Sequence, residues 1–118
     1  MLERHDLCQA VLGGLTGQAL GDAYAMPASL RPEDTWERYG GWLTTFHPGL
    51  DDRPVHAGLP AGRITDDTEQ ACALAEALIQ DRGATVEGAA EAIVRWYDRI
   101  GGRRTPMSAR AAAAPVSS

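Results

Sequence analysis

Three neighbouring side chains that could bind a metal ion stand at the start of a predicted helix. Thr65, Asp66 and Asp67 lie in the segment Gly62–Gln70, directly before a strongly amphipathic stretch. Adjacent carboxylates repel each other, and a hard cation such as Mg²⁺, which prefers oxygen ligands, offsets that repulsion far more than a helix N-terminus does. The alternative is an ordinary cap by Thr65 or Asp66, with Asp67 and Glu69 simply favoured at the positive end of the helix. Spacing alone leaves both interpretations open.

Composition limits the kinds of partner that such a site could serve. The chain has 118 residues, enough for one small domain, and its net charge of -5 gives no basic footprint for nucleic acid. It shows neither a basic leader nor a run of about 20 apolar residues, so no membrane partner is expected. A cytoplasmic protein is the default expectation.

Four helical segments and almost no strand signals are predicted from periodicity and capping residues. The segments are 7–26, 32–43, 65–83 and 85–100. Asp6 and Thr85 have the positions of N-caps, and Gly83 has that of a stop. The residues between the first helix and position 65 are rich in Pro and Gly, which indicates a long loop with several turns.

Small and aromatic residues in these segments carry further expectations. Gly13, Gly17 and Gly21 form one stripe, which could receive either a closely packed helix or a ligand. The free cysteines and the aromatic residues of the second segment are expected to be buried. These residues are Cys8, Cys72, Trp36, Tyr39 and Trp42.

The composition changes after Ile100. Residues 101–118 are rich in Arg and Ala and lack an amphipathic period, which predicts a disordered tail. The expected domain organisation is therefore a helical domain over 1–100 followed by the tail over 101–118. A truncation or a frame change would explain so abrupt an end.

Two motifs together resemble the N-terminal signature of the ADP-ribosylglycohydrolase family, in the branch that includes dinitrogenase reductase-activating glycohydrolase. The first is Gly-Leu-Thr-Gly-Gln-Ala-Leu-Gly-Asp-Ala-Tyr-Ala-Met-Pro over 14–27, and the second is Gly-Leu-Pro-Ala-Gly-Arg-Ile-Thr-Asp-Asp-Thr-Glu-Gln over 58–70. The resemblance covers roughly residues 7–100. It implies that this chain is the N-terminal portion of an all-α ADP-ribosylglycohydrolase-like domain.

The resemblance also implies a metal-dependent hydrolase. Members of the family hold two Mg²⁺ or Mn²⁺ ions and remove ADP-ribose from a protein or a small acceptor. Their metal ligands fall on Thr65, Asp66 and Asp67 of this sequence. The family's Gly-Asp-Ala helix end places Asp22 as a candidate for contacting the substrate or shaping the site around its ligands.

Two departures from the family pattern favour an alternative function. Ser29 stands where many members have an acidic residue, and the family's Asp-x-Asp-Thr cluster, which completes the metal site, has no counterpart here. A non-catalytic fragment that at best binds ADP-ribose or a partner weakly is the alternative. Such a fragment should expose apolar helix faces and have a marginal fold. A helical interaction module outside the family is the third interpretation.

Overall fold

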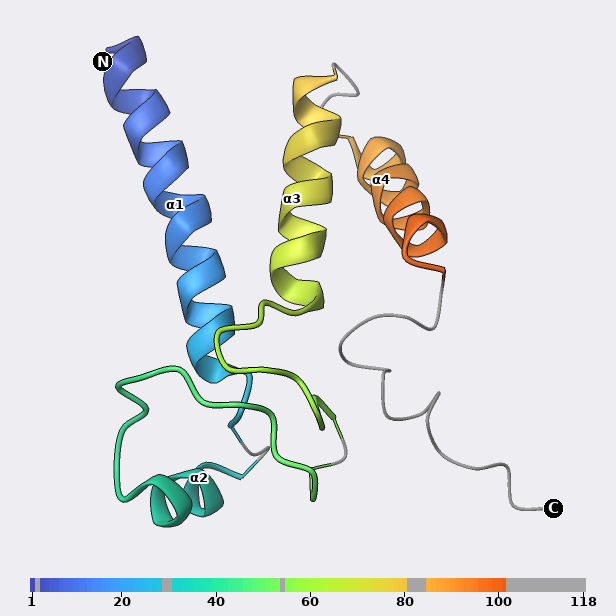
Figure 1. Ribbon diagram of the computed structural model, residues 1–118. Coiled ribbons are helices and arrows are strands. Elements are labelled where there is room, and N and C mark those ends of the chain that lie inside the picture. The colour runs from blue at the N-terminus through green and yellow to red at the C-terminus, as the bar shows by residue number, and fades with distance from the viewer. Residues whose placement is uncertain (2, 29–30, 54, 81–84, 102–118) are drawn as a thin grey trace, which may run out of the picture.

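The computed structural model describes residues 1, 3–28, 31–53, 55–80 and 85–101. Over these residues the chain forms four α-helices and no β-strand, which confirms the all-α prediction. The helices are α1 (Arg4–Ala25), α2 (Pro32–Tyr39), α3 (Asp66–Ile79) and α4 (Val86–Arg99) (Figure 1). Ser29, Gly83 and the predicted tail beyond Gly101 lie outside the described residues, so the predictions about them stay predictions.

The start of α1 differs from its predicted start. Its N-cap is Glu3, so the prediction that Asp6 caps this helix is wrong. Asp6 lies in the first turn instead, where the positive end of the helix dipole stabilises its negative charge. The helix ends at Ala25, just before Pro27, whose ring cannot continue the helical hydrogen-bond ladder.

The second helix opens with a proline and stops at a glycine. Pro32 lies in the first turn of α2, where its missing N–H is no loss. Gly40 adopts a left-handed conformation with φ 68° and donates its backbone N–H to the carbonyl of Trp36. A side chain would strain this conformation, and the glycine therefore ends the helix at Tyr39, short of the predicted limit at residue 43.

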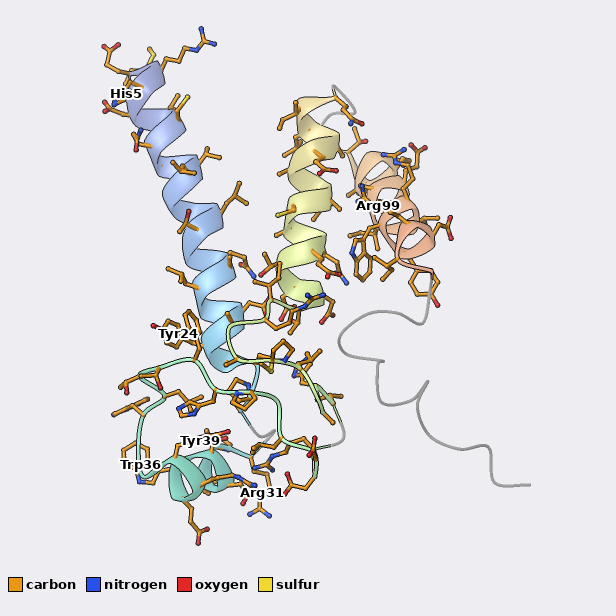
Figure 2. The ribbon with its side chains drawn as sticks, in the orientation of Figure 1. His5, Tyr24, Arg31, Trp36, Tyr39 and Arg99 are labelled. Atoms are coloured by element: carbon orange, nitrogen blue, oxygen red, sulfur yellow. The ribbon has the colours of Figure 1, made fainter. Side chains whose placement is uncertain are left out.

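The two tryptophans predicted as core anchors lie on the surface. Trp36 is 54% exposed and Trp42 is 81% exposed, and their rings meet edge to face with centroids 5.5 Å apart. Together with Tyr24 of α1 they line a hollow of about 500 Å³ beside α2. Figure 2 shows Tyr24 on the side of α1 that faces away from α3. The core prediction is therefore wrong for both tryptophans.

Helices α3 and α4 pack through small side chains and one tryptophan. Ala73 and Ala77 of α3 are buried, as are Ala92 and Trp96 of α4. Trp96 is the one large side chain among them, and it is only 5% exposed. Its Nε1 donates a hydrogen bond to Glu69 Oε2 at 3.2 Å, which satisfies the one polar group of the ring.

The predicted cap of the last helix is confirmed. The Thr85 hydroxyl oxygen accepts a hydrogen bond from the backbone N–H of Gly88 at 3.0 Å, as an N-cap residue does. The helix that precedes it, α3, ends at Ile79.

Helices α1 and α3 run side by side (Figure 1), yet much of their apolar surface is open. The exposed large side chains on these helices are Leu7, Val11, Leu12, Leu15, Leu20, Leu74, Leu78 and Ile79. Exposed apolar helix faces were expected of a partial domain, and the described residues have them. None of the described helices has the length and apolar character that crossing a membrane requires.

The small residues of α1 face open space in this structure. Apart from the adjacent backbone of α1 itself, a Cβ added at Gly13, Gly17 or Gly21 would meet no atom of the described residues within 4 Å. The glycine stripe therefore receives no neighbouring backbone here. Cys8 and Cys72 are exposed, which makes the prediction of buried cysteines wrong, because the helix faces that carry them are themselves uncovered.

The long loop between α2 and α3 folds back onto the end of α1. His56 has φ 63° and its Nδ1 lies 3.0 Å from the carbonyl oxygen of Met26. Gly49 donates its backbone N–H to the Leu59 carbonyl at 2.8 Å and passes close to the His56 backbone. A Cβ at position 49 would lie 1.8 Å from the His56 carbonyl oxygen.

We expect Gly49→Ala to lower the free energy of unfolding by about 1–3 kcal/mol, because the methyl group would collide with backbone rather than with a movable side chain. Urea unfolding followed by circular dichroism measures this loss. Gly13→Ala is the matched control. It should instead raise stability by about 0.5–1 kcal/mol, since it replaces a glycine inside a helix where space is free. Equal effects of the two substitutions would contradict the prediction.

Candidate functional site

The Asp22 carboxylate joins the last turns of α1 to the first turn of α3. Its Oδ2 accepts hydrogen bonds from the backbone N–H groups of Thr65 at 2.7 Å and Thr68 at 3.2 Å. The same oxygen accepts the Thr68 hydroxyl at 2.5 Å, and Oδ1 accepts the Thr65 hydroxyl at 2.6 Å. These four hydrogen bonds match the roughly four acceptor positions of an ionised carboxylate.

Asp22 caps α3 from a different helix. Thr65 occupies the N-cap position of α3 in extended backbone, but its side chain makes no cap hydrogen bond. The first backbone N–H groups of a helix lack intrahelical partners, and here Asp22 accepts the one from Thr68 in that first turn. A carboxylate is favoured at this end by the helix dipole. Thr65 thus holds the N-cap position that the alternative interpretation gave it, but the side chain that caps the helix is that of Asp22 and not that of Thr65.

Hydrogen bonding keeps Asp22 ionised. Burial alone would raise its pKa, but the hydrogen bonds from the side chains and backbone of Thr65 and Thr68 together hold the pKa below the ordinary value of 3.8. The ionised carboxylate can only accept hydrogen bonds, so both threonine hydroxyls donate their single proton to it. Thr65 is 2% exposed and Thr68 is 4% exposed. Asp22 thus satisfies two hydroxyls that water hardly reaches.

The three residues expected as metal ligands differ in accessibility. Thr65 is buried, Asp66 is partly buried and Asp67 is exposed. The Thr65 proton is committed to Asp22, which leaves only lone pairs on its oxygen for any further contact. Neither Asp66 nor Asp67 forms an ion pair within the described residues. Both carboxylates therefore remain available on the first turn of α3.

The chemistry of this donor set fits a hard divalent cation, although the set is small. All three side chains offer oxygen, which suits Mg²⁺ or Mn²⁺ and not Zn²⁺. Mg²⁺ takes about six oxygen ligands, however, and Thr65, Asp66 and Asp67 can supply only part of that number. In the part of the chain that the structure describes, no group of three or more His, Cys, Asp or Glu side chains could hold an ion.

The structure shows contacts of two residues that were not predicted as site residues. Thr68 follows the expected ligands by one position and bonds to the same carboxylate as Thr65, through both its N–H and its hydroxyl. Glu69, in the same turn of α3, accepts the indole N–H of Trp96 and so connects this turn to α4. The signal for Thr68 was present, since a second threonine three positions after the N-cap could only face the same side of the helix start.

The fold and this site define an all-α protein in which the acidic first turn of α3 is hydrogen-bonded to the last turns of α1. Residues 3–117 match the ADP-ribosylglycohydrolase family, and the chain belongs to that family. The chain is 39% identical over 75 residues to the uncharacterized protein YegU of Escherichia coli (strain K12), which covers 64% of this chain and 22% of YegU. It is 35% identical over 99 residues to an uncharacterized protein of Archaeoglobus fulgidus, which covers 82% of this chain and 30% of that protein.

The chain thus spans less than a third of the length of either curated relative. No solved structure matches it.

Proposed function

We propose that this chain contributes to a metal-dependent hydrolase that removes ADP-ribose from a protein or a small acceptor. Membership of the ADP-ribosylglycohydrolase family supports a glycohydrolase-like function. The observation that carries the metal dependence is the pair of carboxylates, Asp66 and Asp67, on the first turn of α3 without ion-pair partners among the described residues. A divalent cation would offset the repulsion between these adjacent charges.

In this proposal each residue has a definite role. Asp66 and Asp67 would hold the cation, and Thr65 would complete their side of the site with the lone pairs of its hydroxyl oxygen. A divalent cation held there would supply Lewis-acid chemistry, in which water replaces the acceptor at the anomeric carbon of the ribose and the acceptor leaves with a proton from that water. Further oxygen ligands would have to come from beyond these three residues.

We expect the Asp66→Asn, Asp67→Asn double variant to lose Mn²⁺ binding, because amide oxygens carry no net charge to attract the ion. Isothermal titration of Mn²⁺ into this chain measures the loss, and we expect the dissociation constant to rise by at least about 100-fold, which corresponds to about 2.7 kcal/mol. A double variant that binds as tightly as the wild type would refute the assignment.

The Asp51→Asn, Asp52→Asn double variant is the matched control, because it removes the same charge from two adjacent acids in the long loop. Among the described residues Asp52 forms one ion pair, with Arg38, and a pair of such exposed side chains contributes little. This variant should bind Mn²⁺ as the wild type does. A similar loss in both variants would mean that general electrostatic attraction, and not a site on α3, explains the binding.

A second candidate function is binding without hydrolysis. The small donor set supports it, since no cluster of three metal-binding acids, histidines or cysteines occurs among the described residues. Release of ADP-ribose from an ADP-ribosylated protein separates the two functions. A hydrolase should release it only with Mg²⁺ or Mn²⁺ present, whereas a binding protein should not release it at any concentration of either ion.

A further inference from the structure

We infer that Asp22 is a positioning residue, which sets the first turn of α3 and thereby the two carboxylates of the proposed metal site, without itself touching the ion or the substrate. This inference rests on the proposed function, and it adds Thr68 to that site as the second residue through which Asp22 acts. Nothing in the sequence motif alone distinguishes this role from direct contact with a ligand.

The first support is where the hydrogen bonds of Asp22 go. All four lead to Thr65 and Thr68, which flank Asp66 and Asp67 on both sides. Two of the bonds come from backbone N–H groups, so the carboxylate fixes the path of the main chain and not merely two side chains. The pair of acids is thus held between two anchored residues.

The second support is the limited capacity that Asp22 has left. Its Oδ2 already accepts three donors, and the fourth occupies Oδ1. A cation or a substrate hydroxyl at Oδ2 would have to compete with these three donors, and Oδ1 keeps a single acceptor position. Breaking those bonds would leave buried hydroxyls unsatisfied, which is costly. The carboxylate is therefore suited to orient neighbouring groups, as residues next to metal ligands do.

The third support is the long sequence separation between the two sides of this contact. Asp22 and Thr65 are 43 residues apart, and the chain between them contains α2 and the turn-rich loop. No cap hydrogen bond from the Thr65 side chain fixes the start of α3. The contact across this separation consequently decides where the first turn begins.

The test uses Asp22→Asn in the full chain. The substitution keeps the size and one acceptor oxygen but replaces the other oxygen with an NH₂ group, which would face donors. We expect Mn²⁺ affinity, measured by isothermal titration, to fall by about 10–100-fold, the usual effect of losing a partner that orients metal ligands. In the metal-free protein we expect faster amide hydrogen exchange at Thr65 and Thr68, with α4 unchanged.

Two further variants separate positioning from general destabilisation. Thr85→Ala removes the cap of α4 and lowers stability at a distance from the site, so Mn²⁺ affinity should remain at the wild-type value. Thr68→Val removes one hydroxyl bond to Asp22 and should weaken Mn²⁺ binding less than Asp22→Asn does. Combining Thr68→Val with Asp22→Asn should weaken it no further than Asp22→Asn alone, because both act through one network.

The outcomes are distinct. A wild-type chain that binds Mn²⁺ and an Asp22→Asn variant that binds it equally well would overturn this inference and leave the proposed function standing. Equal losses in Asp22→Asn and Thr85→Ala would also overturn it, since affinity would then follow stability alone. If the wild-type chain binds no Mn²⁺, the proposed metal site and the positioning role fall together. A loss confined to Asp22→Asn and Thr68→Val, with faster exchange at the two threonine amides, supports the inference.

Discussion

Asp22→Ala is expected to lower the free energy of unfolding by about 2–4 kcal/mol, because it leaves two buried threonine hydroxyls and two backbone N–H groups without their acceptor. Urea unfolding followed by circular dichroism measures the loss. Asp6→Ala removes the same side chain from the exposed first turn of α1 and should cost about 0.3–1 kcal/mol. Equal losses would mean that the four hydrogen bonds contribute nothing beyond the charge.

The effect of Asp22→Ala should depend on pH in a definite direction. The pKa of Asp22 is lowered in the folded chain, so its ionisation stabilises the fold fully above the unfolded-state pKa, near 3.8. This contribution is lost as the pH falls through the lower, folded pKa. The difference in stability between the wild type and Asp22→Ala should therefore be constant at neutral pH and shrink below about pH 4. A difference that stays constant down to about pH 2.5, where most unperturbed carboxyl groups are protonated, would contradict this.

Trp96→Ala is expected to have the other large effect, a loss of about 3–5 kcal/mol in the free energy of unfolding. The indole is 5% exposed and fills the contact between α3 and α4, and its removal would also leave Glu69 without its donor. A loss of this size is comparable to the whole stability of a small domain. We expect the variant to lose cooperative unfolding in urea, followed by far-ultraviolet circular dichroism, which reports the loss of helix.

Trp36→Ala is the matched control for this prediction. It removes the same side chain from α2, where the ring is 54% exposed and contacts Trp42. Its removal should change stability by less than about 1 kcal/mol, because little buried surface is lost. The burial of Trp96 indicates that the core lies between α3 and α4. Equal destabilisation by Trp36→Ala and Trp96→Ala would contradict this.

Local patterns predicted the helices well where the stabilising contacts are themselves local. The amphipathic run after position 65 and the Thr85 cap needed only residues within a few positions, and both agree with the structure. The predicted end of α2 was too late, because the aromatic spacing continues to Trp42 whereas the left-handed conformation of Gly40 ends the helix at Tyr39. Asp6 does not cap α1, because the helix begins before it, at Arg4, and continues through residue 6.

Burial was harder to predict than helix position, because it depends on which faces find a partner. Cys8 and Trp36 have the residue types that usually lie inside proteins, yet both are exposed. The site shows the same limit. The acidic pair could be located from sequence, but the cap that Asp22 supplies to α3 depends on two helices meeting, which no local spacing encodes. Thr68 has a local signal in its spacing from Thr65, but the carboxylate to which it bonds comes from another helix.

The different caps of α3 and α4 have a consequence for the order in which the chain folds. Thr85 and Gly88 are three residues apart, so α4 can nucleate its first turn while the rest of the chain is still random. The first turn of α3, in contrast, is capped only when Asp22 of α1 reaches it. Closing the chain between Asp22 and Thr68 costs conformational entropy before these contacts form. We therefore expect substitutions at Asp22 to accelerate unfolding more than they slow folding, whereas the cap of α4 should already be present in the transition state.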